Sequence, residues 1–282
     1  MTMNQMPLQI DLQAIINARV PHKKRRFVPN ALIRLVEKII CQEQLNAILR
    51  DTHPHEGVAF ADALLRHLNI SIEVIGRENI PSHGRFIFAS NHPLGGLDGI
   101  SLIKVLGDIY GPDGVRFLVN DILMNVRPLR SVFLPINKYG SQGRAAAELI
   151  NQTYASDTQM IIFPAGLVSR RHKGGVIKDL QWQKAFIAKA IEHERDIIPI
   201  YFEGLNSSFF YNFAHWRKHS GLKINIEQAL LPSELVKARD KHFRIHIGRP
   251  VGWQSLKQSD LTPIQLADDI KAAVYDLPQQ RL

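Results

Sequence analysis

A histidine and an aspartate separated by five residues are the pair in this chain that most suggests chemistry. Residues 85–89 are apolar and aromatic, which indicates a buried strand, and His92 follows soon after it. Asp98 falls in the first turn of a helix expected over residues 97–110. An aspartate that accepts a hydrogen bond from one ring nitrogen fixes the histidine tautomer, so the other nitrogen can take a proton from a hydroxyl. We therefore predict that His92 is a general base and Asp98 its partner; the alternative is a turn residue and a helix cap.

The residues between this pair favour a ligand site at the end of the strand. Pro93 biases His92 toward extended backbone, and Gly95 and Gly96 permit a tight turn and the close approach of another molecule. No cysteine and no G-x-S-x-G serine lies near His92. The attacking hydroxyl would therefore belong to a substrate. The crevice beyond the carboxyl ends of the strands is where open α/β sheets bind ligands.

Strands and helices alternate from residue 70 onward. Apolar runs predict strands over residues 70–75, 85–89, 115–119, 132–136, 159–163, 197–202 and 243–247. Helical spacing of apolar residues predicts one or two helices over residues 30–50, and single helices over residues 8–18, 55–68, 97–110, 143–154, 181–194, 209–216 and 262–276. The pattern indicates an α/β fold: a largely parallel mixed sheet flanked by helices, with a helical N-terminal extension. We expect residues 1–68 to form the extension and residues 69–282 the main domain.

Three further loops that follow strands, at residues 138–144, 164–171 and 204–208, are rich in glycine, arginine and small polar residues. If the strands are parallel, these loops gather at the same sheet edge as His92. Gly166 would let the backbone approach a ligand, and Arg170 could hold a carboxylate or phosphate with two hydrogen bonds. Taken singly, each loop also fits a plain turn with surface arginines. The candidate substrate-binding residues of the four loops are Asn91, Gly95, Gly96, Arg144, Gly166, Ser169, Arg170, Asn206 and Ser207.

Composition limits the class and the compartment. With 282 residues, 45% of them hydrophobic and 22% charged, the chain reads as an ordinary globular protein. The single cysteine, Cys41, excludes a disulfide framework and a thiolate metal site, and we expect no metal. The lone cysteine also indicates a reducing compartment, so we expect a cytoplasmic protein. No run of about 18 apolar residues occurs, which predicts no membrane span, and the N-terminus lacks a signal-peptide pattern. The net charge of +9 suits an acidic partner: anionic lipid, an acidic carrier protein or nucleic acid.

Nucleic acid is the poorest of these partners, because the aromatic residues fall on expected strands and apolar helix faces rather than among lysines and arginines. Residues 22–26 form a basic cluster ahead of an amphipathic helix expected from residue 30. Such a pair is typical of docking on an anionic membrane surface. A helix packed on the main domain beside a solvated charge cluster fits equally well.

Three blocks along the chain, in this order, resemble the glycerol-phosphate and lysophospholipid acyltransferase superfamily. That family has an N-H-x4-D block, then F-P-E-G-T-R-S-R, then a late V-P-I strand. The matching residues here are Asn91-His92 with Asp98, Phe163-Pro164-Ala165-Gly166 with Ser169-Arg170, and Ile198-Pro199-Ile200. The resemblance covers roughly residues 70–250 and implies that the main domain is an acyltransferase domain. It implies acyl transfer from a thioester of acyl carrier protein or coenzyme A to a hydroxyl, with His92 as general base, Asp98 orienting it, and no cofactor.

Two departures from that pattern point to a particular branch. Five residues instead of four separate His92 from Asp98, and Ala165-Gly166-Leu167-Val168 replaces E-G-T-R. In the family, that glutamate and arginine recognise a glycerol-phosphate acceptor. The blocks N-H-P-x-G-G-x-D-G, F-P-A-G-x-V-S-R and G-x-N-S-x-x-F are more similar to the branch that O-acylates N-(3-hydroxyacyl) amino acids and completes ornithine or glycine lipids. The donor in that branch is acyl carrier protein, and the acceptor carboxylate would meet Arg170 or Lys173.

The resemblance therefore implies an O-acyltransferase that acts on a lyso-ornithine or lyso-glycine lipid and sits peripherally on the inner face of the cell membrane. A second enzymatic hypothesis keeps 1-acyl-glycerol-3-phosphate as acceptor, with Arg144 and Arg170 holding its phosphate. A hydrolase is a third hypothesis, because water could replace the acceptor. A hypothesis from another class is a basic, non-catalytic protein that binds lipid at a membrane surface.

Overall fold

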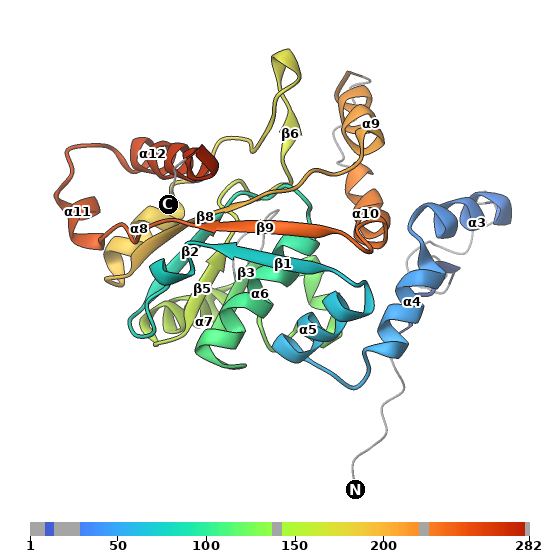
Figure 1. The fold of residues 1–282 in the computed structure, drawn as a ribbon, viewed down its shortest axis with the longest axis horizontal. Coiled ribbons are helices and arrows are strands. Elements are labelled where there is room, and N and C mark those ends of the chain that lie inside the picture. The colour runs from blue at the N-terminus through green and yellow to red at the C-terminus, as the bar shows by residue number, and fades with distance from the viewer. Residues whose placement is uncertain (1–8, 14–28, 137–142, 220–225, 280–282) are drawn as a thin grey trace, which may run out of the picture.

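The computed structural model describes residues 9–13, 29–136, 143–219 and 226–279. Within these residues the main sheet has seven strands (Figure 1). Their order across the sheet is β1 (Ser71–Ile75), β9 (His242–Ile247), β8 (Asp196–Phe202), β2 (Phe86–Ser90), β5 (Gln159–Ile162), β3 (Val115–Asn120) and β4 (Phe133–Ile136). All neighbours pair in parallel except β8 and β9, which are antiparallel. The predicted largely parallel mixed sheet is confirmed.

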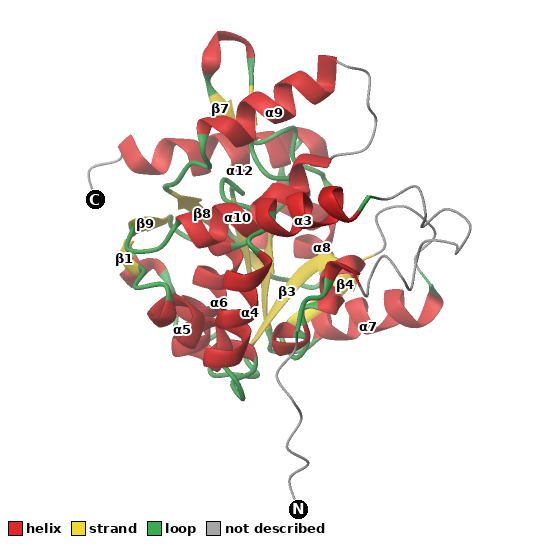
Figure 2. Cartoon of the chain, turned by 90° about the vertical axis from the view of Figure 1, so that its right-hand side faces the viewer, coloured by secondary structure: helices red, strands yellow, loops and turns green. Residues whose placement is uncertain are grey.

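The central strand β2 is buried along its whole length, since helices cover both faces of the sheet (Figure 2). Successive side chains of a strand point to opposite faces. Phe86 and Phe88 enter the core beneath α5 (Gly57–His67) and α6 (Leu97–Tyr110). Ile87 and Ala89 enter a second core. The helices over that second core are α7 (Arg144–Ala155), α8 (Ala185–Glu192), α11 (Trp253–Gln258) and α12 (Pro263–Asp276).

Parallel pairing places the carboxyl ends of β2, β5, β8, β3 and β4 at one edge of the sheet. The loops after β2, β5 and β8 therefore meet there, as predicted; residues 137–142, after β4, lie outside the described residues. A small hairpin of β6 (Arg170–Arg171) and β7 (Ile177–Lys178) and the helix α9 (Ser208–His219) rise from the same edge (Figure 1).

The N-terminal region is helical, in agreement with the sequence. The helix pattern over residues 30–50 becomes two helices, α3 (Asn30–Ile39) and α4 (Gln42–Asp51), because Cys41 between them adopts a left-handed backbone with φ +56°. Helix α5 contributes Phe60 and Leu64 to the core that α6 shares. The domain division at residue 68 stays a prediction. Most of the helix expected over residues 8–18, and the basic residues 22–26, lie outside the described residues.

Several elements were not predicted. They are the β6–β7 hairpin, the helices α10 (Leu231–Lys237) and α11, and the 3₁₀ helices Arg77–Asn79, Asp121–Asn125, Arg127–Leu129, Lys173–Gly175, Ile226–Leu230 and Leu277–Gln279. The helix expected over residues 181–194 begins only at Ala185. The preceding residues remain irregular, and among them Trp182 is fully buried and donates its indole N–H to Asp179.

Candidate functional site

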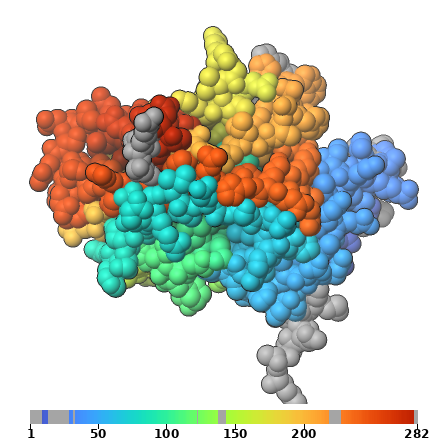
Figure 3. Space-filling model, viewed as in Figure 1, coloured from blue at the N-terminus to red at the C-terminus, as the bar shows by residue number. Residues whose placement is uncertain are grey.

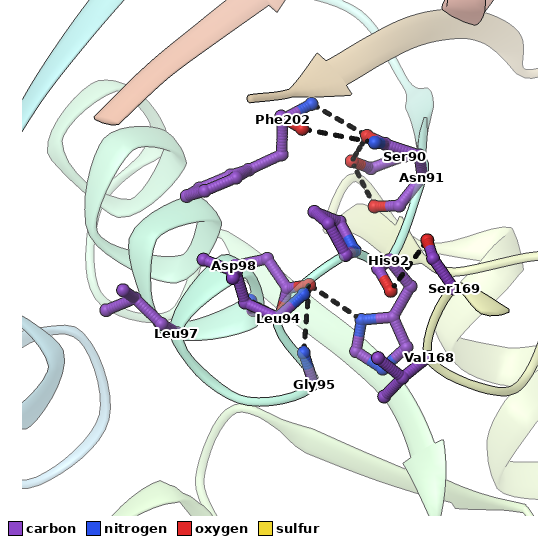
Figure 4. Close-up of polar contacts among 12 residues, drawn as sticks. Ser90, Asn91, His92, Leu94, Gly95, Leu97, Asp98, Val168, Ser169 and Phe202 are labelled. Atoms are coloured by element: carbon purple, nitrogen blue, oxygen red, sulfur yellow. Dashed lines mark hydrogen bonds and ion pairs between the residues drawn. The ribbon is translucent and has the colours of Figure 1, made fainter. Parts of the chain in front are cut away.

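His92 and Asp98 face each other across the turn between β2 and α6 (Figure 4). Nδ1 of His92 lies 2.9 Å from Oδ2 of Asp98. An ionised carboxylate can only accept, so Nδ1 carries the proton of this hydrogen bond. The other ring nitrogen, Nε2, has no hydrogen bond to any described residue. Because 14% of the His92 side chain is exposed while Asp98 is fully buried, Nε2 is the nitrogen left to accept a proton from outside.

The turn itself closes around the Asp98 carboxylate. Oδ2 also accepts from the backbone N–H groups of Leu94, at 2.9 Å, and Gly95, at 3.2 Å. Oδ1 accepts from the N–H of Gly99 at 2.9 Å. Burial acts to raise the pKa of Asp98, but attraction to His92 and the hydrogen bonds from the ring and from these amides outweigh it, and the pKa lies below its ordinary value. Asp98 is therefore a carboxylate at neutral pH, despite being buried.

Aromatic packing holds the His92 ring on its other side. The ring stacks on Phe163 with centroids 4.0 Å apart and an interplanar angle of 17°. Phe163 in turn meets Phe117 edge to face at 5.2 Å. Gly99 makes room for this packing, because a Cβ there would come within 2.6 Å of Phe117. One face of the imidazole is thereby shielded from water.

Two predicted substrate-binding asparagines hold the turn instead of lying open. The side chain of Asn91 pairs with the backbone of Phe202 on β8: Oδ1 accepts its N–H at 2.7 Å and Nδ2 donates to its carbonyl at 3.1 Å (Figure 4). Asn206 donates from Nδ2 to the carbonyl of Pro93 at 3.1 Å. Both side chains are buried. They tie the β8 loop to the β2 turn, and contact with a substrate stays a prediction for each.

Asp179 was not predicted, and it fixes the backbone of His92. Its Oδ1 accepts the His92 N–H at 3.2 Å and the Ser169 hydroxyl at 2.5 Å, and its Oδ2 accepts the indole N–H of Trp182 at 2.9 Å. Ser169 also donates its backbone N–H to the His92 carbonyl at 2.8 Å. A signal for Asp179 existed: it is the one acidic residue between Asp157 and Glu192.

The match to a family model settles what class of protein carries this arrangement. The model described as "Acyltransferase" matches residues 15–271, which is most of the chain. The chain belongs to this acyltransferase family. Acyl transfer, the activity implied by the sequence blocks around His92, is confirmed at the level of the family.

Two curated proteins are similar to this acyltransferase over nearly their full lengths. A lyso-glycine lipid O-acyltransferase of Phocaeicola vulgatus is 43% identical over 268 residues, covering 95% of both chains. A lyso-glycine lipid O-acyltransferase of Bacteroides thetaiotaomicron is 43% identical over 269 residues, covering 95% of this chain and 97% of that one. Among solved structures, the 1-acyl-sn-glycerophosphate acyltransferase of Thermotoga maritima matches with a TM-score of 0.46 and 14% identity, over 95% of this chain and 88% of that chain.

In the acyltransferase, Arg170 is engaged in a buried ion pair. Its Nη2 lies 2.8 Å from Oε1 of Glu227, and Nη1 donates to the Val168 carbonyl at 2.7 Å. Arg217 on α9 meets the same carboxylate at 2.9 Å. Burial lowers the pKa of Arg170, although Glu227 works in the opposite direction. Through Glu227, the guanidinium links the β6 strand to the 3₁₀ helix Ile226–Leu230 and to α9. Its contact with an acceptor carboxylate stays a prediction.

Ser207 and Arg144 were also predicted to bind substrate. Ser207 donates its backbone N–H and its hydroxyl to Glu234 of α10, at 2.6 and 2.8 Å. Arg144 is exposed at the first position of α7. A role in substrate binding stays a prediction for both.

The glycines of the site differ in what they leave available. Gly95 has φ +82°, and a Cβ there would come within 2.7 Å of Leu231 and 2.8 Å of Val168, so only glycine fits. Its N–H binds Asp98, and the N–H of Gly166 binds the Phe163 carbonyl at 2.9 Å. The N–H of Gly96, at the start of α6, has no partner among the described residues.

The described part of the chain offers neither a membrane span nor a cluster of metal ligands. There, no helix combines the length and the apolar character needed to cross a bilayer. No group of three or more His, Cys, Asp or Glu side chains within the same residues could hold a metal ion. A small cavity of about 10 Å³ is lined by Leu94, Leu97, Asn206, Glu234, Leu235 and Ala238.

Proposed function

We propose that this acyltransferase moves a fatty acyl group from an acyl thioester to the hydroxyl of an N-(3-hydroxyacyl) amino acid, with lyso-glycine lipid as the acceptor. The observation that carries the proposal is the His92–Asp98 hydrogen bond, which leaves Nε2 without a partner among the described residues. The 43% identity to two lyso-glycine lipid O-acyltransferases over 95% of this chain supports the choice of acceptor.

The reaction needs one proton carrier and no protein nucleophile. Nε2 of His92 takes the proton of the acceptor hydroxyl as the oxygen attacks the thioester carbonyl carbon. The charged Asp98 stabilises the imidazolium that forms, because it accepts the hydrogen bond from Nδ1. The tetrahedral intermediate then expels the thiolate, which takes the proton back from Nε2. The products are an ester and a free thiol, and His92 returns to its starting state.

The developing oxyanion needs a hydrogen-bond donor near the reacting carbon. Three glycines of the site could offer backbone N–H groups, but Gly95 and Gly166 already donate theirs within the protein. The N–H of Gly96 is free among the described residues, and a Cβ built at this glycine would meet no atom within 4 Å. We assign Gly96 as an oxyanion donor on these grounds. The positive end of the α6 dipole adds to the same effect.

Acyl carrier protein is the donor that we propose, and the inner face of the cell membrane is the place of action. The net charge of +9 favours both an acidic carrier protein and an anionic lipid surface. The acceptor of such a reaction is itself an amphiphile, which concentrates at a bilayer. A protein that acts on it gains from staying at that surface.

Purified protein offered matched acceptors and donors tests the function. The acceptors are lyso-glycine lipid, lyso-ornithine lipid and lysophosphatidic acid, each with palmitoyl-acyl carrier protein or palmitoyl-coenzyme A, and the products are identified by mass spectrometry. We expect an O-acylated glycine lipid, with His92→Ala protein as the inactive control. Acylation of lysophosphatidic acid alone would overturn the proposed acceptor. Release of free fatty acid without any acylated product would indicate a hydrolase.

A further inference from the structure

Helix α9, next to the catalytic turn, carries a ridge of three aromatic side chains, two of them exposed and the middle one partly buried. Phe209, Phe213 and Trp216 lie at positions i, i+4 and i+7, so they share one face of the helix. Their rings stack in sequence with centroids 6.0 Å apart. Phe209 and Trp216 are each 59% exposed, as is Leu205 just before the helix. The other face of α9 packs on the body of the protein through Phe210, Tyr211 and Ala214.

The β6–β7 hairpin projects beside this ridge, and together they form one raised surface (Figure 3). Arg171 of β6 donates to the side chain of Asn212 on α9 at 2.7 Å. At the end of the hairpin, Val176 is 51% exposed. We call residues 170–178 and 205–217 together the platform. Both parts of the platform are joined in the chain to loops that hold His92. The hairpin begins directly after Ser169, and α9 follows the loop after β8.

The platform presents positive charge without negative charge. No aspartate or glutamate occurs between Asp157 and Asp179, or between Glu203 and Glu227. Of these four acids, Asp179 and Glu227 are buried and engaged within the protein. Exposed basic side chains of the hairpin are Arg171, Lys173 and Lys178. A surface of large aromatics edged by cations is therefore displayed at the edge of the sheet where His92 lies.

We propose that the platform docks on the surface of a bilayer that contains anionic lipid, with the aromatic ridge at the boundary between headgroups and acyl chains. Tryptophan and phenylalanine beside basic residues are typical of segments that lie in this boundary, where cations meet lipid headgroups. An acidic carrier protein would need the cations but not a projecting row of aromatics. Docking in this way turns the His92 edge of the sheet toward the layer that holds a lyso-lipid acceptor. The inference rests on the membrane association in the proposed function.

Tryptophan fluorescence locates the contact directly, because the three tryptophans differ in exposure. Trp182 is fully buried and Trp253 is partly buried, whereas Trp216 is exposed. The full chain is mixed with phosphatidylcholine vesicles, with and without phosphatidylglycerol, that contain a brominated phospholipid. We expect quenching with the anionic vesicles, weakened by added salt. Trp216→Phe keeps an aromatic ring and should keep vesicle binding, but should lose most of the quenching.

Co-sedimentation with the same vesicles measures the contribution of the ridge. The double variant Phe209→Ser/Trp216→Ser should bind the anionic vesicles at least about tenfold more weakly, because two large apolar side chains no longer enter the boundary. A control variant, Leu149→Ser/Leu261→Ser, replaces two exposed apolar residues away from the platform and should bind like the wild type. Both variants should acylate a short-chain, water-soluble acceptor as fast as the wild type does.

The possible results separate this inference from the proposed function. Strong vesicle binding that is unchanged in the ridge variant, or quenching that persists in Trp216→Phe, would overturn the platform and leave membrane action intact. No vesicle binding by the wild type would overturn both the platform and the proposed membrane association, while the acyltransferase assay still tests the reaction. Weaker binding of acyl carrier protein by the ridge variant, with vesicle binding unchanged, would assign the platform to the donor protein instead.

Discussion

Two buried carboxylates hold His92 from opposite ends. Asp98 accepts from the imidazole ring, while Asp179 accepts from the backbone N–H of the same residue. The bonds of Asp98 stay within one turn of chain, and its main partner can carry a charge. The donors to Asp179 are neutral and come from three separate segments, through Ser169 and Trp182 as well as His92. We infer that Asp98 supplies charge to the reaction and that Asp179 fixes geometry.

Removing the group that both carboxylates serve should have the largest effect. His92→Ala should lower kcat about 10³-fold or more, because no other histidine among the described residues bonds to Asp98 and could act as general base in its place. The measurement is the initial rate of O-acylation by protein shown to be folded by near-ultraviolet circular dichroism. His242→Ala, an exposed histidine on β9, is the control and should stay active. A His92→Ala protein with near wild-type turnover would remove the basis of the mechanism.

The next largest effect is expected at the ring-binding carboxylate. Asp98→Asn keeps the shape of the side chain but removes its charge, so the imidazolium formed during attack loses its stabilising partner. We expect kcat to fall roughly 10²-fold or more while KM changes little, since Asp98 is fully buried and out of reach of substrate. Steady-state kinetics with the preferred acceptor separate the two constants. A change confined to KM would contradict this role.

Asp179→Asn should lower the stability of the fold clearly and kcat only modestly, in contrast to Asp98→Asn. An amide must place its NH₂ group against the donors of Ser169 and His92 or of Trp182, which leaves buried polar groups unsatisfied at a cost of about 1–3 kcal/mol. We expect a clear loss of stability in urea unfolding and a fall in kcat of only about tenfold. If kcat instead falls as far as in Asp98→Asn, with stability unchanged, Asp179 takes part in the chemistry and the contrast between the two carboxylates fails.

Acid should weaken the Asp98 contribution in a defined direction. In the folded protein the pKa of Asp98 lies below its ordinary value of 3.8, so its ionised form stabilises the fold above that pH and the contribution is lost as pH falls further. The stability difference between the wild type and Asp98→Asn should therefore shrink as pH falls below about 4. Urea unfolding at a series of pH values measures it. A difference that grows toward acid would mean that burial raises this pKa.

The sequence predicts the chemical pair better than it predicts the supports around it. The strand, the glycine turn and the helix over residues 97–110 are all local patterns, and together they place His92 near Asp98. The blocks that resemble the acyltransferase family are also short and local, so the sequence predicts acyl transfer as well. Local patterns do not indicate which residues form hydrogen bonds across the sheet. Asn91 meets Phe202, although 110 residues lie between them in the chain.

Long-range contacts also involve residues whose predicted roles are untested, and residues that the sequence did not point to. Arg170 looks like a ligand-binding arginine in the sequence, yet its guanidinium meets Glu227, which belongs to a segment with no recognisable pattern. Asp179 follows a two-stranded hairpin too short to be predicted. The antiparallel pairing of β9 with β8 likewise joins strands that are far apart in the chain. Local periodicity contains none of this information.

Ser169 gives the smallest effect and the sharpest choice between a positioning role and the predicted substrate contact. Its hydroxyl lies 2.5 Å from Oδ1 of Asp179 and 3.2 Å from the His92 carbonyl. In Ser169→Ala, the backbone N–H still binds the His92 carbonyl, and Asp179 keeps its donors from His92 and Trp182. Loss of one hydrogen bond of about 1 kcal/mol predicts a fall in kcat of a few-fold with unchanged KM.

A substrate-binding Ser169 would show the opposite pattern, with a raised KM and little change in kcat. Ser255→Ala removes an exposed hydroxyl that binds a local backbone carbonyl on α11, and it should leave both constants unchanged. Combining Ser169→Ala with Asp179→Asn gives the decisive comparison. If the serine acts only through Asp179, its effect on kcat should largely disappear in the double variant, because the acceptor that it orients has already been altered. Full additivity would place its hydroxyl on the substrate.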